Sequence, residues 1–334
     1  MNVNEIREKS RSVIGPYCKS CPVCNGKAWS NKIPGPGSKG TGTVAIKNYE
    51  AWQKIEVKMD TLAENKEIDT TFEMFGKTFK YPIFAGPVGA VSQHYSDLYN
   101  DNMFNEIYVR ACAKSGIAAF TGDGLNEEIM MHATHYIKEN NGIGVPTIKP
   151  WDKDTCFKKL DLANESNAFA IAMDIDAAGL PFLQGRIPPA GRKSVEELKE
   201  IIDYAHVPFI VKGIMSVEGA QKAVDAGAKA IVVSNHGGRV LDGTPATACV
   251  LEEIADQFKG QVKIIVDGGI RSGLDGFKAL ALVIIARPFV NMIYGGKDEG
   301  VESYVQQLGQ ELENTMMMTG VSSLREISKK NIYK

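Results

Sequence analysis

Short apolar runs alternate with amphipathic segments throughout the chain after residue 80. Each run has four to six residues, mostly Ile, Val, Ala or Phe, which is typical of strands buried on both faces of a parallel sheet. The runs cover residues 83–88, 117–121, 144–149, 169–174, 208–212, 230–234, 262–267 and 283–286. Eight buried strands separated by helices predict an α/β fold, the (β/α)8 TIM barrel, with an open doubly wound sheet as the alternative.

Start signals and an internal repeat support this interpretation. Ser194 and Glu197 form a capping-box pattern at the start of the amphipathic stretch SVEELKEIIDYA. The motif GIMS (213–216) recurs 56 residues later as GIRS (269–272), as expected for repeated βα units. The strands that follow the two motifs match at an offset of 52 rather than 56, so the last helix-to-strand connection is four residues shorter. We expect an irregular closure at the last strand.

Residues 1–75 differ in character from the rest of the chain. They contain a cysteine cluster, the Gly/Pro-rich stretch IPGPGSKGTGT and one polar helical pattern over residues 49–65. We therefore predict an N-terminal extension over residues 1–75 and a barrel over residues 76–334. The pattern Gly35-x-Gly37-x-x-Gly40 has the glycine spacing of a dinucleotide-binding motif. It follows no predicted strand, however, and we interpret it as a flexible loop.

Composition disfavours several classes of protein. Hydrophobic residues make up 44% of the chain and charged residues 23%, as in ordinary globular proteins. The longest apolar run has eight residues, far fewer than the roughly 18 that span a membrane. The net charge of −2 disfavours a nucleic-acid partner. The polar start MNVNEIREKSRSVIG lacks a signal-peptide core and the six cysteines suit reduced thiols, so we expect the cytoplasm.

Polar residues at the ends of the predicted strands are the candidate site residues, because active sites of such barrels lie at the C-terminal ends of the strands. They are Thr121, Lys149, Asp174, Lys212, Asn235, His236, Asp267, Arg271 and Arg287. A charged group at a buried strand end is costly unless it meets an opposite charge or a bound group. This applies to Lys212 and to Asp174, whose carboxylate could stabilise a protonated His236.

Two glycine-rich segments follow the sixth and seventh runs. In SNHGGR (234–239) the glycines let the backbone approach a ligand. His236 supplies a proton acceptor tunable around neutral pH, and Arg239 can hold a carboxylate bidentately. In DGGIRSG (267–273) backbone N–H groups, a helix N-terminus and Arg271 predict a phosphate site, with Arg287 as a second contact. A turn-capping His and surface arginines are the alternatives.

These segments resemble the FMN-dependent α-hydroxy-acid oxidase/dehydrogenase family, which includes glycolate oxidase, lactate oxidase and the flavin domain of flavocytochrome b2. The similarity is dense over residues 208–289 and thinner over residues 82–174. It implies a TIM barrel that binds FMN at its mouth and oxidises a 2-hydroxy acid to a 2-oxo acid.

The resemblance also implies roles for single residues. His236 would be the base that removes a substrate proton, with Asp174 as its partner, and Arg239 would bind the substrate carboxylate. Lys212 would stabilise negative charge on the reduced flavin. The implied FMN-binding residues are Pro87, Val88, Gly89, Thr121, Lys149, Lys212, Ser234, Asp267, Gly268, Gly269, Arg271, Ala286 and Arg287.

Several positions depart from the family pattern. A second substrate-binding Arg is usual about seven residues past Asp174, where this chain has Pro181, with Arg186 five residues further on. Lys149 and Trp151 stand where a flavin-contacting Gln and a substrate Tyr are usual, and the Gly/Pro-rich stretch replaces an N-terminal Tyr. An FMN barrel with isomerase-type chemistry and a non-catalytic flavin-binding module therefore stay open as alternatives.

The remaining signals are weaker. Cys18, Cys21 and Cys24 have the spacing of a metal or iron–sulfur site, although Ala28 stands where a fourth ferredoxin-type Cys would come. Reduced thiols in a loop are the alternative. The Met run at 316–318 predicts an apolar packing surface, and we expect a homo-oligomer. The sequence does not identify the electron acceptor. The histidines interpreted as ordinary are His94, His132, His135 and His206.

Overall fold

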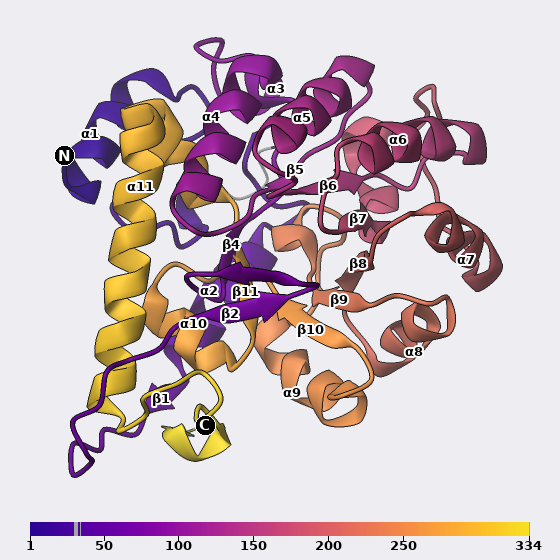
Figure 1. Cartoon of the computed structure of the whole chain (residues 1–334). Coiled ribbons are helices and arrows are strands. Elements are labelled where there is room, and N and C mark those ends of the chain that lie inside the picture. Colours follow the sequence, from indigo (N-terminus) through magenta and orange to yellow (C-terminus); the bar gives the residue numbers. More distant parts are fainter. Residues whose placement is uncertain (30–32, 34, 334) are drawn as a thin grey trace.

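Eight parallel strands form a closed barrel at the centre of the computed structural model, which describes residues 1–29, 33 and 35–333 (Figure 1). They pair in the order β4-β11-β10-β9-β8-β7-β6-β5. A parallel bridge between Ala85 and Ala119 joins β4 to the segment before β5 and closes the ring. The strands are β4 (Ile83–Ala85), β5 (Phe120–Thr121), β6 (Val145–Ile148), β7 (Ile171–Asp174), β8 (Phe209–Ile214), β9 (Ala230–Val233), β10 (Lys263–Val266) and β11 (Leu282–Ile285).

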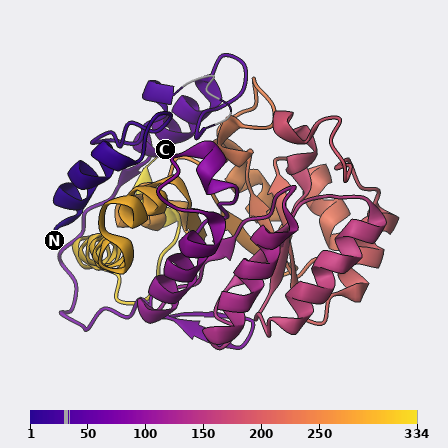
Figure 2. The same ribbon diagram turned by 90° about the horizontal axis from the view of Figure 1, so that it is seen from above.

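Each predicted apolar run overlaps one of these strands. The predicted TIM barrel is confirmed, and the open doubly wound alternative is wrong because β4 and β5 meet. Helices surround the strands in both views (Figures 1 and 2). Those that follow a barrel strand are α3 (Val91–His94), α4 (Asp101–Lys114), α5 (Glu127–Glu139), α6 (Lys153–Glu165), α7 (Val195–Tyr204), α8 (Val217–Asp225), α9 (Thr247–Phe258), α10 (Gly273–Ala279) and α11 (Arg287–Met318).

Polar side chains set the starts of many of these helices. The predicted capping box is present at α7, where Ser194 Oγ accepts from Glu197 N at 3.2 Å and Glu197 Oε2 accepts from Ser194 N at 2.7 Å. Side chains of Asn100, Asn126 and Asp152 cap α4, α5 and α6 in a similar way.

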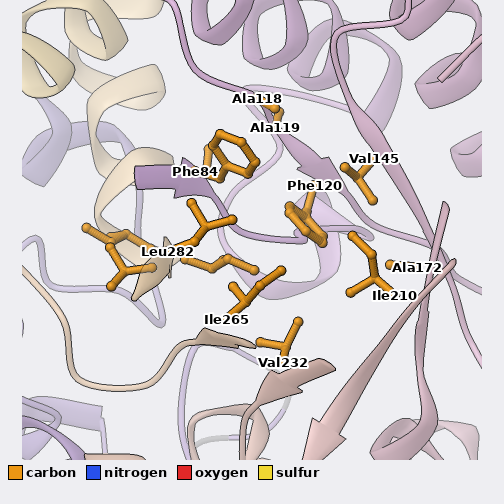
Figure 3. Packing of buried hydrophobic residues seen from close by; sticks show 14 of the residues in the cluster. Phe84, Ala118, Ala119, Phe120, Val145, Ala172, Ile210, Val232, Ile265 and Leu282 are labelled. Atoms are coloured by element: carbon orange, nitrogen blue, oxygen red, sulfur yellow. The ribbon is translucent and has the colours of Figure 1, made fainter. Parts of the chain in front are cut away.

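The barrel interior is filled by apolar side chains from neighbouring strands (Figure 3). The ring centroids of Phe84 and Phe120 lie 6.4 Å apart, and Ile210, Val232 and Ile265 fill the space beside them (Figure 3). Because side chains alternate between the two faces of a strand, Lys212 shares the inward face with Ile210. Lys212 lies two residues closer to the C-terminal end of β8 than Ile210 does. The apolar core therefore ends where the charged residues of the mouth begin.

The connection before the last strand is shorter than its counterpart, by two residues rather than the expected four, and the other two residues are missing from α10, which has 7 residues against 9 in α8. Two residues, Leu280 and Ala281, separate α10 from β11, whereas four residues separate α8 from β9. Gly227 turns the longer connection with a φ of 101°, but Leu280 turns the shorter one with a φ of 52°. A non-glycine residue in this left-handed region is strained. The expected irregular closure is therefore present.

The N-terminal segment packs against the barrel. Helix α1 (Val3–Val13) lies along α11, as Figures 1 and 2 both show. Helix α2 (Thr43–Gln53) contacts α9, α10 and the short helix η4 (His236–Gly238). The short strand β1 (Glu56–Val57) pairs with β12 (Ile332–Tyr333) near the end of the chain. The boundary at residue 75 stays a prediction.

The remaining short elements complete the description. The hairpin of β2 (Phe72–Met74) and β3 (Lys77–Phe79) covers the N-terminal end of the barrel, where the ring centroids of Phe79 and Phe84 lie 4.6 Å apart. Short 3-10 helices are η1 (Lys27–Trp29), η2 (Ile175–Gly179), η3 (Pro181–Leu183) and η5 (Lys329–Asn331). Within the described ranges, no helix combines the length and the apolar character needed to cross a bilayer.

The capping box gives a direct test of the local energetics. We expect Ser194→Ala to lower the free energy of unfolding by about 1 kcal/mol, because the N–H of Glu197 loses its acceptor. Urea denaturation monitored by circular dichroism would measure this. Ser12→Ala is the control, since the Ser12 hydroxyl is exposed and bonds only within its own helix. Equal stability of S194A and the parent protein would contradict the expectation.

Candidate active site

A cavity with about 1010 Å³ of empty space, including its open mouth, lies at the C-terminal ends of the barrel strands. Most of the predicted site residues line it. Thr121, Ser234 and Asn235 are the exceptions, and all three are buried beside lining residues. The predicted residues that line the cavity are Pro87, Val88, Gly89, Lys149, Asp174, Lys212, His236, Arg239, Asp267, Gly268, Gly269, Arg271, Ala286 and Arg287.

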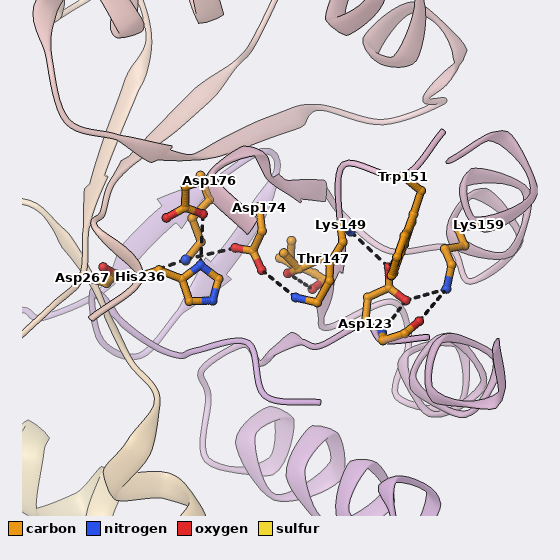
Figure 4. A network of polar contacts seen from close by, with 12 residues as sticks. Asp123, Thr147, Lys149, Trp151, Lys159, Asp174, Asp176, His236 and Asp267 are labelled. Atoms are coloured by element: carbon orange, nitrogen blue, oxygen red, sulfur yellow. Dashed lines mark hydrogen bonds and ion pairs between the residues drawn. The ribbon is translucent and has the colours of Figure 1, made fainter. Parts of the chain in front are cut away.

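His236 forms a dyad with Asp176, not with Asp174. Its Nδ1 lies 3.0 Å from Asp176 Oδ1, and its backbone N donates to Ser234 Oγ at 3.1 Å (Figure 4). Asp174 is therefore not the hydrogen-bond partner that was expected, although one of its carboxylate oxygens lies within 4.8 Å of a ring nitrogen of His236. Asp174 ends β7 and pairs with lysines, while Asp176 lies two residues further on in η2. An N–H at Nδ1 bonded to a carboxylate leaves Nε2 free to accept a proton.

Gly213 leaves the space that Asp176 occupies. It sits at a bulge in β8 with a φ of 105°. A Cβ at this position would lie 2.5 Å from Asp176 Cγ, closer than real Cβ contacts occur. A glycine is therefore needed in the GIMS motif for the carboxylate to reach His236.

Two lysines share the Asp174 carboxylate. Lys212 Nζ lies 3.0 Å from Asp174 Oδ1, and Lys149 Nζ lies 3.8 Å from Oδ2 (Figure 4). Burial alone would raise the pKa of Asp174, but Lys212, His236 and Lys149 lower it below its usual value. Burial alone would lower the pKa of Lys212, but Asp174, Asp267 and Asp176 raise it. Lys212 thus stays positively charged although it is 2% exposed.

The carboxyl group of Asp267 has fewer charged partners than that of Asp174. Its Oδ2 lies 3.5 Å from Lys212 Nζ, while its buried Oδ1 has no hydrogen-bond partner among the described residues. Burial raises the pKa of Asp267, and Lys212 and Ser234 offset only part of that shift. An unpaired buried oxygen that belongs to a cavity-lining residue suits a hydrogen bond to a bound polar group.

Arg239 is half-buried at the mouth, beside the N-terminal segment. Its Nη1 donates to the carbonyl oxygens of Gly35 and Gly37, at 3.2 Å to Gly37. Burial, and secondly the charge of Arg287, lower the pKa of Arg239 to about 10. The guanidinium remains charged at neutral pH. The segment interpreted as a flexible loop therefore contributes two acceptors to the site.

Arg271 and Arg287 form a cationic pair at the cavity wall. Arg271 Nε donates to Cys24 O at 2.7 Å, and Arg287 Nη2 donates to Gly237 O at 3.2 Å. A Cβ at Gly237 would come within 2.6 Å of Arg287, so the glycine permits this approach. Burial and the nearby charge of Arg271 lower the pKa of Arg287. Two neighbouring guanidinium groups favour a bound anion between them.

A buried network behind the mouth was not predicted. Asp123 accepts from Lys159 Nζ at 2.6 Å, from Trp151 Nε1 at 2.6 Å and from Lys149 N at 3.0 Å (Figure 4). The position of Asp123 directly after the second predicted strand could have indicated it. Lys159 gave no signal, because it lies within the helix α6. Trp151 is fully buried in this network.

Two further predicted groups lie elsewhere. Arg186 is exposed and does not line the cavity. Cys18 is buried with Sγ 3.3 Å from Asn291 Oδ1, and burial raises the pKa of its thiol to about 12. Among the described residues, the sulfur atoms of the cysteine cluster do not gather closely enough to share one metal ion. The geometry favours the reduced-thiol alternative.

Together these features define a class of protein: a TIM barrel whose mouth carries a buried lysine, a His–Asp dyad and an arginine pair for an anion. The chain matches the FMN-dependent dehydrogenase family over residues 36–186 and 182–334, so it belongs to that family. FMN is the family's cofactor. The residues present fit it, because the arginine pair suits the phosphate and the unpaired Asp267 oxygen suits a polar group of the ligand.

Known proteins show partial similarity. A peroxisomal (S)-2-hydroxyacid oxidase from Arabidopsis thaliana is 41% identical over 144 residues, which are 42% of this chain and 39% of that protein. Glycolate oxidase 1 from Zea mays is 41% identical over 143 residues, with the same shares of 42% and 39%. The matched region thus spans about two fifths of these relatives' length. A mandelate oxidase structure with (S)-2-phenylpropionate shares the fold at a TM-score of 0.80, with 23% identity and 99% and 97% coverage.

The Asp123 network predicts a strong effect of removing its cation. We expect Lys159→Met to lower the free energy of unfolding by about 3–5 kcal/mol, because an uncompensated carboxylate stays buried. The double variant D123N/K159M removes both charges and should recover part of that loss. Urea denaturation would measure both. A K159M protein as stable as the parent would show that Asp123 does not depend on this cation.

The arginine pair predicts the strength of cofactor binding. We expect Arg287→Gln to weaken FMN binding about 10- to 100-fold, because one charge-assisted hydrogen bond to the phosphate is lost. Flavin fluorescence quenching on the deflavinated protein would give the dissociation constant. Arg192→Gln is the matched control on an exposed loop. An unchanged dissociation constant for R287Q would place the phosphate elsewhere.

Proposed function

We propose that this protein oxidises a 2-hydroxy acid to a 2-oxo acid and that FMN accepts the two electrons. The observation that carries the proposal is the convergence of three groups on one cavity: the His236–Asp176 dyad, the Arg239 guanidinium and the buried Lys212 ammonium. Oxidation of a 2-hydroxy acid needs a base, a group that binds the carboxylate and a cation near the electron acceptor.

Each residue has a defined part in this chemistry. Nε2 of His236 takes a proton from the substrate, and Asp176 at Nδ1 stabilises the imidazolium that results. Arg239 holds the substrate carboxylate, and Lys212 supplies a fixed positive charge where negative charge accumulates. FMN, when bound, supplies the two-electron acceptor. The residues proposed to hold it include Lys149, Asp267, Arg271 and Arg287.

A second function is favoured by two observations on substrate binding. Arg186 is exposed, and Trp151 is turned into the Asp123 network, so neither takes the part of the usual second Arg and Tyr. A site that cannot pair the polar atoms of a substrate selects against it. An FMN barrel with isomerase-type chemistry is therefore the alternative. Anaerobic bleaching of the flavin by a 2-hydroxy acid would exclude that alternative, and no bleaching by any such acid would favour it.

Two further properties stay proposals. We propose the cytoplasm as the compartment, although two relatives from Arabidopsis thaliana are named as peroxisomal. We also keep a homo-oligomer. Met316 is packed into the core and Met317 is 53% exposed, so only part of the Met run is available for a subunit contact. The electron acceptor that reoxidises the flavin is not assigned.

The dyad gives the central test of the proposed function. The protein as purified should show a flavin absorbance spectrum, and glycolate, lactate or mandelate added without oxygen should bleach it. We expect His236→Ala to keep its flavin but to be reduced at least 100-fold more slowly, because the proton acceptor is lost. Asp176→Asn should also slow reduction, whereas Asp203→Asn, on an exposed part of α7, should not. Rapid reduction of the H236A flavin would contradict the assignment of the base.

A further inference from the structure

His94 is a buried histidine of the cavity that the proposed chemistry does not yet use. It ends α3, is 7% exposed and lines the cavity wall. Its ring packs against that of Phe182 in an edge-type contact, with ring centroids 5.2 Å apart. Its sequence context carries no motif, so only the folded chain reveals the position.

The hydrogen bond at one ring nitrogen determines the tautomer. Gly35 N donates to His94 Nδ1 at 3.0 Å. A backbone N–H can only donate, so Nδ1 accepts and carries no proton, and the proton of the neutral ring lies on Nε2. Burial, and then the charges of Arg239 and Lys149, lower the pKa of His94 to about 3. The ring is therefore a neutral donor at physiological pH, and among the described residues its one hydrogen bond is that at Nδ1.

Gly35 places this donor beside Arg239. The N–H of Gly35 bonds to His94, and the carbonyl oxygen of the same residue accepts from Arg239 Nη1. One residue of the N-terminal segment thus holds an imidazole and a guanidinium at the same mouth. A carboxylate has two oxygens, and a neutral N–H next to a guanidinium can donate to the oxygen that the guanidinium leaves free.

We propose that Nε2–H of His94 is a second recognition donor for the substrate carboxylate, beside Arg239, and thus a specificity-determining residue of this site. The proposal rests on the proposed function. Arg186 is exposed and Trp151 donates to Asp123, so neither offers a donor to the substrate. His94 supplies the donor that these two residues do not. A neutral donor also adds no further positive charge beside Arg239.

Two variants separate the two ring nitrogens. His94→Asn can keep an acceptor for the N–H of Gly35 but places no donor at the position of Nε2. His94→Gln places an amide donor near that position. Oxalate is the probe, because it is a carboxylate that binds without turnover. Calorimetric titration of the FMN-loaded proteins, with the flavin absorbance recorded in parallel, would give each dissociation constant.

We expect H94N to bind oxalate about 10- to 100-fold more weakly than the parent, as for loss of a hydrogen bond to a charged group. H94Q should bind more tightly than H94N, and the exposed-site control His206→Gln should match the parent. With a 2-hydroxy acid, KM should rise more than kcat falls. A purely structural role of His94 would make H94N, which keeps the acceptor for Gly35, bind oxalate at least as tightly as H94Q.

The outcomes distinguish this proposal from the proposed function. Equal oxalate affinity of H94N and the parent, or no oxalate binding by the parent, would overturn the role of His94. If the parent binds oxalate and H94N binds it more weakly, the role of His94 in binding a carboxylate is supported. If, in the same proteins, no 2-hydroxy acid bleaches the flavin, the proposed function is wrong while the role of His94 is retained.

Discussion

The mouth of the barrel depends on the register between two neighbouring strands. Asp174 and Lys212 are register partners on β7 and β8, so their side chains emerge on the same face and at the same height. Backbone hydrogen bonds set this pairing, and the core below it excludes water. An ammonium and a carboxylate in such a place are tolerated only because each compensates the other. The ion pair therefore follows from the register of β7 and β8, and the positive charge of Lys212 is retained because of the ion pair.

The charges around the cavity are distributed to suit a cofactor with an anionic end. Five cationic side chains meet four carboxyl groups: Lys149, Lys212, Arg239, Arg271 and Arg287 against Asp123, Asp174, Asp176 and Asp267. The lysines are balanced by nearby carboxylates, whereas Arg271 donates to the backbone oxygen of Cys24 and Arg287 to that of Gly237. The two neighbouring guanidinium groups form a positively charged part of the wall that suits a phosphate group. Local positive charge also favours a reaction that moves negative charge into the cavity.

Much of this arrangement was predictable because it is local in the chain. The eight apolar runs, the capping box at Ser194 and the two glycine-rich segments are each read from a few adjacent residues. The partner of His236 was not predictable in this way. Asp174 and Asp176 are two residues apart and chemically identical, and the choice between them depends on the bulge at Gly213 in another strand. The Asp123 network was missed for a similar reason, since Lys159 approaches from a helix that follows the next strand.

The sequence by itself determined the fold class, the order of strands and helices, and the inventory of groups at the strand ends, because periodicity and turn chemistry are local. The tertiary structure decided which of these groups meet. It joined His236 to Asp176, turned Trp151 into a buried network and brought the Gly35 segment between His94 and Arg239. Such pairings depend on register, bulges and the path of distant segments, and the free energy of burying each charge is known only once its neighbours are in place.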